Sequence, residues 1–340
     1  MFFERSFKRA YRVAGLMLAM TGGVWSLPVE AAERFKCRAS AQVLDEALNA
    51  YARSDYTGAR KRFECLIAEG DGTQKFYASF YLARILSDTN GHETDHDKAY
   101  TVYTDFFMQN QGVDTDDPRK APFVAKALTA IGMYALRGSP EAGVKRSPQK
   151  AAELFRQSAS TFDEPDSQFE LAKLLLVGEG VKPDPDLALH YLQKLTQESH
   201  AGAQAFLSDL MWRGKHVPRQ QVQAYALIQL ALENATPADR LWIEDTYQNI
   251  YCGLGEGVRQ QSTGLVGNWR RQFLKPLTTD PLVPVPQDAE LSPVRTCANG
   301  DRVIFPHSRL GGPSSGDTAK LPDAVRPAGS QSLGMEPNRR

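Results

Sequence analysis

Residues 169–192 read FELAKLLLVGEGVKPDPDLALHYL, two apolar segments joined by a connection rich in glycine and proline. Both segments carry apolar residues at helical spacing, Leu171, Leu174 and Leu175 in the first and Leu187 and Tyr191 in the second. This periodicity predicts two amphipathic helices. Gly178 and Gly180 end the first helix because glycine adopts the left-handed backbone that a helix end requires, and Pro183 keeps the connection from becoming helical. The stretch is therefore a helical hairpin.

The hairpin pattern recurs, imperfectly, at three other places in the chain. The first helices carry small residues 49, 40 and 36 positions apart, at Ala83, Gly132, Ala172 and Ser208, and the second helices carry alanines at Ala99, Ala151, Ala188 and Ala224. Small side chains at a fixed period let two helices cross closely, so a period near 36 is typical of stacked hairpins. We therefore predict an all-α fold, a right-handed α-solenoid, in preference to an irregular helical domain with chance similarity.

The repeats occupy only part of the chain. Apolar residues within 44–68 predict a further hairpin before them, and one more helix is expected over 238–251. From Pro276 onward apolar runs nearly vanish, although Asn299-Gly300 favours a small β-hairpin between 294 and 305. The predicted segments are a signal peptide (1–31), an N-terminal capping hairpin (32–74), the repeat solenoid (75–275), a Pro-rich extension (276–309) and a mostly disordered tail (310–340).

The N-terminus has the pattern of a secretory signal peptide. Basic residues precede an apolar stretch of 15 residues, Val13 to Leu27, which is shorter than the roughly 20 needed to cross a bilayer. We predict cleavage after Ala31, export to the periplasm and no membrane insertion afterwards; the alternative is an uncleaved N-terminal anchor. Removal of 1–31 takes four basic and two acidic groups from a chain of formal charge zero and leaves −2. Nothing in this charge favours nucleic acid or an anionic membrane as a partner.

Four cysteines follow the cleavage point, an even number in a chain routed to an oxidising compartment. Three pairings are possible. We favour Cys37 with Cys65 and Cys252 with Cys297, because each bond would fasten one end of the chain and leave the repeats between them free to stack. The alternative is that some of the four are buried free thiols.

The phrase Leu-Ala, then Gly-Glu-Gly-Val, then Asp or Pro before Ala and Tyr resembles the Sel1-like repeat, a relative of the tetratricopeptide repeat, over roughly residues 75–235. A closer resemblance, carried by 159–162, 170–172, 177–180 and 199–203, is to periplasmic Sel1 proteins that regulate exopolysaccharide production negatively. That resemblance implies an exported protein that binds the periplasmic sensor domain of a histidine kinase and holds the kinase off until proteolysis or release. The four cysteines and the extension after Leu274 depart from the family.

His92-Glu93-Thr94-Asp95-His96 fits the H-E-x-x-H pattern, in which a zinc peptidase places two imidazoles on one helix face beside a general base. The repeat alignment instead places 92–96 in the loop between two helices, and no third ligand follows at the family spacing. We predict an exposed polar loop here, with no metal, no cofactor and no catalytic residue in the chain. The acidic run Asp114, Asp116 and Asp117 is likewise expected to be a solvated loop, since it lacks the spacing of a calcium loop.

A protein partner is expected on the first helices of successive hairpins, because stacked hairpins form an extended binding surface. Its predicted contacts are Lys173, Asp209, Trp212 and Arg213, while Gly178, Gly180, Ala172 and Ala188 are expected to be structural. The leading hypothesis is a scaffold that restrains a signalling protein. An envelope assembly factor or chaperone shares the same scaffold, and a zinc-dependent envelope peptidase using His92, Glu93 and His96 is the third alternative.

Overall fold

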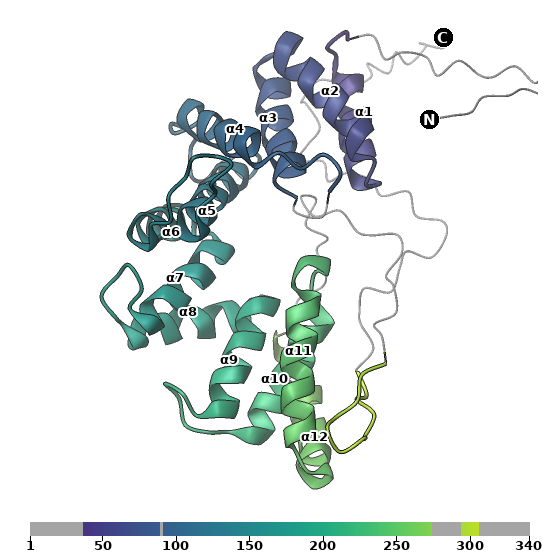
Figure 1. The fold of residues 1–340 in the computed structure, drawn as a ribbon, viewed down its shortest axis with the longest axis vertical. Coiled ribbons are helices and arrows are strands. Elements are labelled where there is room, and N and C mark those ends of the chain that lie inside the picture. Colours follow the sequence, from purple (N-terminus) through teal and green to yellow (C-terminus); the bar gives the residue numbers. More distant parts are fainter. Residues whose placement is uncertain (1–36, 89–90, 274–293, 306–340) are drawn as a thin grey trace, which may run out of the picture. The chain divides into compact units, whose positions relative to one another are not determined.

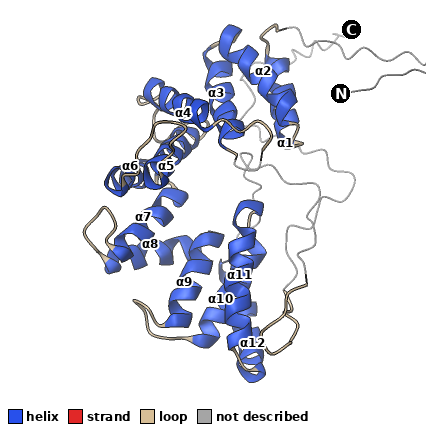
Figure 2. Ribbon diagram, viewed as in Figure 1, coloured by secondary structure: helices blue, strands red, loops and turns tan. Residues whose placement is uncertain are grey.

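The computed structural model describes residues 37–88, 91–273 and 294–305, and these ranges contain twelve α-helices (Figures 1 and 2). The helices are α1 (Ala41–Ala52), α2 (Tyr56–Glu69), α3 (Gly72–Ser87), α4 (His96–Gln109), α5 (Ala121–Arg137), α6 (Pro148–Phe162), α7 (Pro165–Val177), α8 (Pro185–Gln197), α9 (Ala201–Arg213), α10 (Gln221–Asn234), α11 (Pro237–Gly253) and α12 (Glu256–Phe273). The expected signal peptide and C-terminal tail lie outside the described residues. No helix within those residues combines the length and apolar content that crossing a membrane requires.

Most of these helices begin at a residue whose side chain accepts a hydrogen bond from the first helical turn. The capping residues are Ser40, Asp55, Asp71, Asp95, Ser147, Glu164, Asp184, His200 and Thr236. Such caps satisfy backbone N–H groups that have no partner inside the helix. Proline occupies the first position of α6, α7, α8 and α11, where its fixed φ favours the helix and its missing N–H costs nothing. The helix starts are therefore encoded locally.

One hydrogen bond recurs in four successive hairpins. The N–H of the residue before the second helix donates to the carbonyl three residues after the small position of the first helix: Asp95 to Leu86 (2.8 Å), Ser147 to Ala135 (2.7 Å), Asp184 to Leu175 (3.0 Å) and Gln220 to Met211 (3.0 Å). Every small residue and alanine of the predicted period is buried. In the last of these hairpins the Ser208 hydroxyl donates to the Ala224 carbonyl at 2.8 Å. The predicted period is thus confirmed, and its small residues lie where the two helices of a hairpin meet.

The hairpin formed by α1 and α2 has the same internal geometry. The Asp55 N–H donates to the Ala50 carbonyl at 2.9 Å, and Ala47 and Ala59, at the equivalent positions, are completely buried. The predicted N-terminal cap is therefore a divergent copy of the repeat. The side chain of Asp71 caps the next helix, α3, which begins at Gly72.

Each helix from α1 to α10 packs against the next one along the chain, which gives the stacking expected of an α-solenoid. The α1–α5 core is rich in aromatic residues, and the core over α5–α10 is built mainly from leucine and alanine. The turn after α7 lies against the start of α6, since a Cβ placed on Gly180 would be 2.3 Å from the Pro148 carbonyl carbon. Gly178 and Gly180 both have the predicted left-handed φ, +74° and +72°. Turns, as well as helices, stack between neighbouring repeats.

The C-terminal end breaks the pattern. The helix expected over 238–251 is α11, but α12 was not predicted, and it packs against α10. The Arg270 guanidinium reaches the buried carboxylate of Glu233 at 2.8 and 3.0 Å and so fixes α12 to α10. Within α11 the position one period after Ser208 is Glu244, where the repeats have a small residue. No second helix crosses α11 there among the described residues; residues 294–305, which we term the strap, lie against it instead.

The strap forms the predicted small hairpin, with one antiparallel bridge between Thr296 and Arg302 and a left-handed Gly300. Its Cys297 is bonded to Cys252 of α11, and Cys37 is bonded to Cys65 of α2, with Cα–Cα separations of 5.5 Å in both cases. Both predicted pairings are therefore confirmed. Each bond fastens a segment that precedes or follows the helical array.

Candidate interaction surface

One stripe of each of the first helices α5, α7, α9 and α11 is left uncovered by the repeat packing. In α7 the stripe is Asp166, Glu170, Lys173 and Val177, while the residues between them are buried. Similar spacing continues the stripe across the neighbouring first helices. We term the whole set the first-helix surface: Lys126, Met133 and Arg137 of α5, the four residues of α7, Phe206, Asp209 and Arg213 of α9, and Leu241 and Asp245 of α11. Lys173, Asp209 and Asp245 follow one another at intervals of 36 residues.

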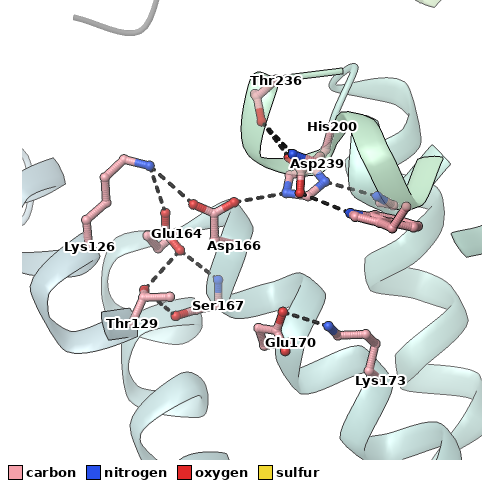
Figure 3. A network of polar contacts seen from close by, with 12 residues as sticks. Lys126, Thr129, Glu164, Asp166, Ser167, Glu170, Lys173, His200, Thr236 and Asp239 are labelled. Atoms are coloured by element: carbon pink, nitrogen blue, oxygen red, sulfur yellow. Dashed lines mark hydrogen bonds and ion pairs between the residues drawn. The ribbon is translucent and has the colours of Figure 1, made fainter. Parts of the chain in front are cut away.

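At one end of this surface polar contacts connect three helices (Figure 3). The Lys126 ammonium of α5 lies 3.3 Å from Asp166 and 3.5 Å from Glu164, both at the start of α7. Asp166 in turn meets His200 Nε2 at 3.1 Å, and His200 Nδ1 accepts the Ala203 N–H at 3.0 Å, as the cap of α9. We term Lys126, Glu164, Asp166 and His200 the charged bridge, since it links three successive repeats.

Glu164 is the buried member of the charged bridge, with a side chain only 4% exposed. It caps α7 by accepting the Ser167 N–H at 2.7 Å, and it also accepts from the Thr129 hydroxyl at 3.2 Å. Burial, together with the negative charge of Asp166, raises the pKa of Glu164. For Asp166, desolvation favours a higher pKa, but the charge of Lys126 and the hydrogen bond from His200 outweigh it and lower the pKa. The two carboxyls therefore share one ammonium and differ in their affinity for protons.

Replacing Lys126 with methionine is expected to destabilise the protein by about 1–3 kcal/mol at pH 7, because a buried and a surface carboxylate then face each other without their cation. The lowered pKa of Asp166 means that its ion pair stabilises above the ordinary aspartate pKa and is lost as the pH falls. The raised pKa of Glu164 means that protonation relieves its burial as the pH falls. Both effects make the difference in unfolding free energy between Lys126→Met and the wild type smaller below about pH 5.

Urea unfolding at pH 7 and pH 4 measures this difference. Lys150→Met is the matched control, because its ion pair with Glu153 is exposed and contributes little. An equal loss at both pH values for Lys126→Met would show that its methylene packing matters and the charged bridge does not.

The polar groups predicted as partner contacts are paired within their own helices. The Lys173 ammonium lies 2.6 Å from Glu170 and 4.6 Å from the centre of the Phe169 ring, and Arg213 lies 2.8 Å from Asp209. Trp212 does not belong to this surface: a Cβ on Gly253 of α11 would lie 2.5 Å from its ring, and the Arg219 guanidinium stacks on it at 5.2 Å. The structure thus groups Lys173, Asp209 and Arg213 and places Trp212 in the contact between α9 and α11.

Two large apolar side chains on the first-helix surface escaped the sequence reasoning. Val177 at the end of α7 is 68% exposed and Leu241 of α11 is 67% exposed. Phe206 lies between them along the chain, partly exposed and with its ring centre 5.9 Å from that of Phe169. The sequence could have identified these residues, because each is an apolar residue in a helix stripe that otherwise carries polar side chains. The surface therefore combines pre-paired charges with exposed apolar groups.

The H-E-x-x-H stretch departs from the expectation in one respect. Residues 92–95 lie in the connection as predicted, but His96 is the first residue of α4. Glu93 is not a free loop carboxylate, since it accepts from Thr57 and pairs with Arg60, both at 2.6 Å, and the tyrosine hydroxyl of Tyr134 meets His96 Nδ1 at 3.0 Å. Glu93 and His96 are thus engaged with different partners, and Glu93 ties the connection to α2. The run at 114–117 is a turn in which Asp114 and Asp117 accept backbone N–H groups.

The Sel1 repeat family matches residues 125–160, 165–200 and 201–235. The chain is 26% identical over 224 residues to the exopolysaccharide production negative regulator of Rhizobium leguminosarum bv. viciae, covering 65% of this chain and 74% of that protein. It is 27% identical over 231 residues to the protein of the same name from Rhizobium meliloti (strain 1021), covering 67% and 76%.

Two solved structures are also similar. A protective antigen of uropathogenic Escherichia coli strains, described as displaying an SLR fold, is 24% identical with a TM-score of 0.41; the match covers 68% of this chain and about half, 53%, of the antigen. A Sel1 repeat protein from Oxalobacter formigenes is 19% identical with a TM-score of 0.47, covering 67% of this chain and 88% of that protein. The three matched repeats correspond to α5–α6, α7–α8 and α9–α10, the helices that carry most of the first-helix surface.

Proposed function

Because this chain carries Sel1 repeats and is similar to two negative regulators of exopolysaccharide production, we propose that it is an exported scaffold that lowers exopolysaccharide production by binding a protein partner. The partner we favour is the periplasmic domain of a sensor histidine kinase, held in its off state while bound. The N-terminal basic and apolar pattern and the two disulfides support a periplasmic location, since disulfides persist in oxidising compartments.

The observation that carries the binding role is the first-helix surface. Most of its charged side chains are already paired, so binding requires little reordering of them, and Val177 and Leu241 offer apolar contact area that the fold itself leaves open. Apolar groups at the centre of an interface, surrounded by satisfied polar groups, supply most of the binding free energy of typical protein complexes. A protein partner with an apolar contact patch fits this arrangement.

A strain lacking the gene is expected to produce more exopolysaccharide, and the wild-type gene should restore the lower level. Genes encoding Leu241→Arg or Val177→Arg should restore it only in part, because a charge would replace apolar contact area without disturbing the core. Arg213→Ala, which removes the exposed partner of Asp209, is expected to have a smaller effect. Trp212 is a poor probe, since its replacement would disturb the contact with α11.

Met108→Arg supplies the matched control, because Met108 is 62% exposed but lies on α4, a second helix. It should behave as the wild type does, and all variants should melt within a few degrees of the wild type. Unchanged exopolysaccharide and envelope signalling in the deletion strain would reject the regulator and favour an envelope assembly factor. Full restoration by both arginine variants would instead place the partner on another surface.

A further inference from the structure

The strap, residues 294–305, is held on α11 by contacts at several points. Arg295 pairs with Glu244 at 3.3 Å and with Asp245. The Tyr247 hydroxyl donates to the Ile304 carbonyl at 2.7 Å, and the Gln248 side chain donates to the Thr296 carbonyl at 3.1 Å. The remaining links are a ring contact between Phe305 and Tyr247 at 5.2 Å and the bond from Cys297 to Cys252.

The strap has little structure of its own. Its internal support is one bridge, three backbone hydrogen bonds donated by Cys297, Gly300 and Val303, and two hydrogen bonds between Asn299 and Asp301 at the turn. An isolated two-stranded hairpin is marginal in water even when longer than this one. Its order therefore depends on α11, and the covalent bond keeps it at a high local concentration beside that helix.

The helix beneath the strap does not depend on it in the same way. Ile243 and Ile250 of α11 are fully buried in a cluster that includes Tyr225, Ile228 and Leu232 of α10, and α11 packs on both α9 and α10. Two contacts of α11 do not involve the strap: the Tyr247 hydroxyl is hydrogen-bonded to the Tyr225 hydroxyl at 3.0 Å, and Glu244 forms an ion pair with Arg240 at 2.8 Å. Loss of the strap therefore uncovers one face of α11 and leaves its packing on the repeats in place.

We propose that the Cys252–Cys297 bond is a redox-sensitive latch: when a dithiol opens it, the strap leaves α11 while the helical repeats stay folded. Cys252 lies in the last turn of α11 and is partly exposed, whereas Cys297 is only 9% exposed, so Cys252 is the sulfur that a thiol reaches. The uncovered face would present Tyr247, which the strap contacts through Ile304 and Phe305, so the reduced and oxidised proteins differ in the surface that the C-terminal end offers.

The exchange proceeds in two balanced steps. One thiolate of the dithiol attacks Cys252 Sγ, the bond between the two protein sulfurs breaks, and Cys297 leaves as a thiolate that takes up a proton. The second thiol then attacks the first sulfur of the dithiol, forms its internal disulfide and releases Cys252. The dithiol loses two electrons, and the two cysteines gain them together with two protons.

Hydrogen exchange of the full-length protein, read by mass spectrometry, tests the latch. The samples are the oxidised wild type, the same protein treated with dithiothreitol, Cys252→Ser/Cys297→Ser, and Cys37→Ser/Cys65→Ser as the matched control; alkylation of free thiols shows which bond each treatment has opened. We expect amides of the strap to exchange at least about tenfold faster when Cys252–Cys297 is open, with unchanged exchange over α3–α10. Reoxidation of the wild type should restore slow exchange in the strap. Cys37→Ser/Cys65→Ser, in which the Cys252–Cys297 bond is intact, should show the same slow exchange.

Two results would overturn the proposal. Unchanged protection of the strap in the reduced protein and in Cys252→Ser/Cys297→Ser would show that the non-covalent contacts hold it without the bond. Loss of protection over α9 and α10 together with the strap would show that the bond supports the fold as a whole and opens nothing separately. The reduced wild type is folded before treatment, so the second result cannot arise from failure of a variant to fold.

Discussion

Gly180→Ala is expected to destabilise the protein by about 2–5 kcal/mol, which combines the cost of a left-handed alanine with a collision. The φ of Gly180 is +72°, and its new Cβ would lie 2.3 Å from the Pro148 carbonyl carbon and 2.5 Å from the Gln149 nitrogen. Both atoms belong to the backbone at the start of α6 and cannot turn aside as a side chain can. The turn after α7 would have to move away from the preceding repeat.

Two further glycines separate the causes of this loss. Gly143→Ala has a similar φ of +64° and no atom within 4 Å of the new Cβ, so it should cost only the backbone term of about 1–2 kcal/mol. Gly178→Ala, with φ of +74° and the Pro183 ring 2.5 Å from the new Cβ, should lie between the other two. Chemical unfolding of the three variants gives the order. If Gly180→Ala is no worse than Gly143→Ala, the stacking of turns between repeats is not as described.

The helical array was predictable because its decisive residues recur. A small residue in the first helix and an alanine in the second repeat along the sequence, and together they define the hairpin. Helix α12 could not be found in this way. Its apolar residues Leu265, Val266 and Trp269 make a short stripe among glycines and polar residues, and the ion pair between Arg270 and Glu233 attaches it to a helix far back in the sequence. No sequence pattern within α12 itself predicts that ion pair.

The candidate surface was only partly predictable, for a related reason. The sequence reasoning named Lys173, Asp209 and Trp212 as exposed positions of the first helices, and it added Arg213 beside Trp212 because binding hot spots favour tryptophan and arginine. Trp212 is covered by Gly253 of α11, which lies 41 positions further along the chain. Because glycine has no side chain, nothing in the sequence at this position indicates the contact. The charged bridge likewise joins residues of three repeats. Such contacts follow from the stacking of repeats, which a single repeat does not specify.

The crossing of α5 and α6, where Gly132 meets Phe155, offers the sharpest test of the fold. Phe155 of α6 is completely buried against α5, and a Cβ on Gly132 would lie 2.6 Å from its ring. Phe155→Ala is expected to cost about 3–5 kcal/mol, because it removes a buried ring and leaves a cavity between the helices. Thermal or urea unfolding measures the loss, and Phe162→Ala, at a partly exposed position of the same helix, should cost clearly less.

The same contact predicts a change of sign for Gly132→Ala. In the wild type the new methyl group collides with Phe155, and overpacking of about 1–3 kcal/mol exceeds the gain of about 1 kcal/mol from alanine in a helix interior. In the Phe155→Ala background the collision is gone, so the substitution keeps the helix gain, fills part of the cavity and stabilises the protein. A double-mutant cycle measures this coupling directly. Equal effects of Gly132→Ala in both backgrounds would mean that glycine is present there for a reason other than the close approach of α6.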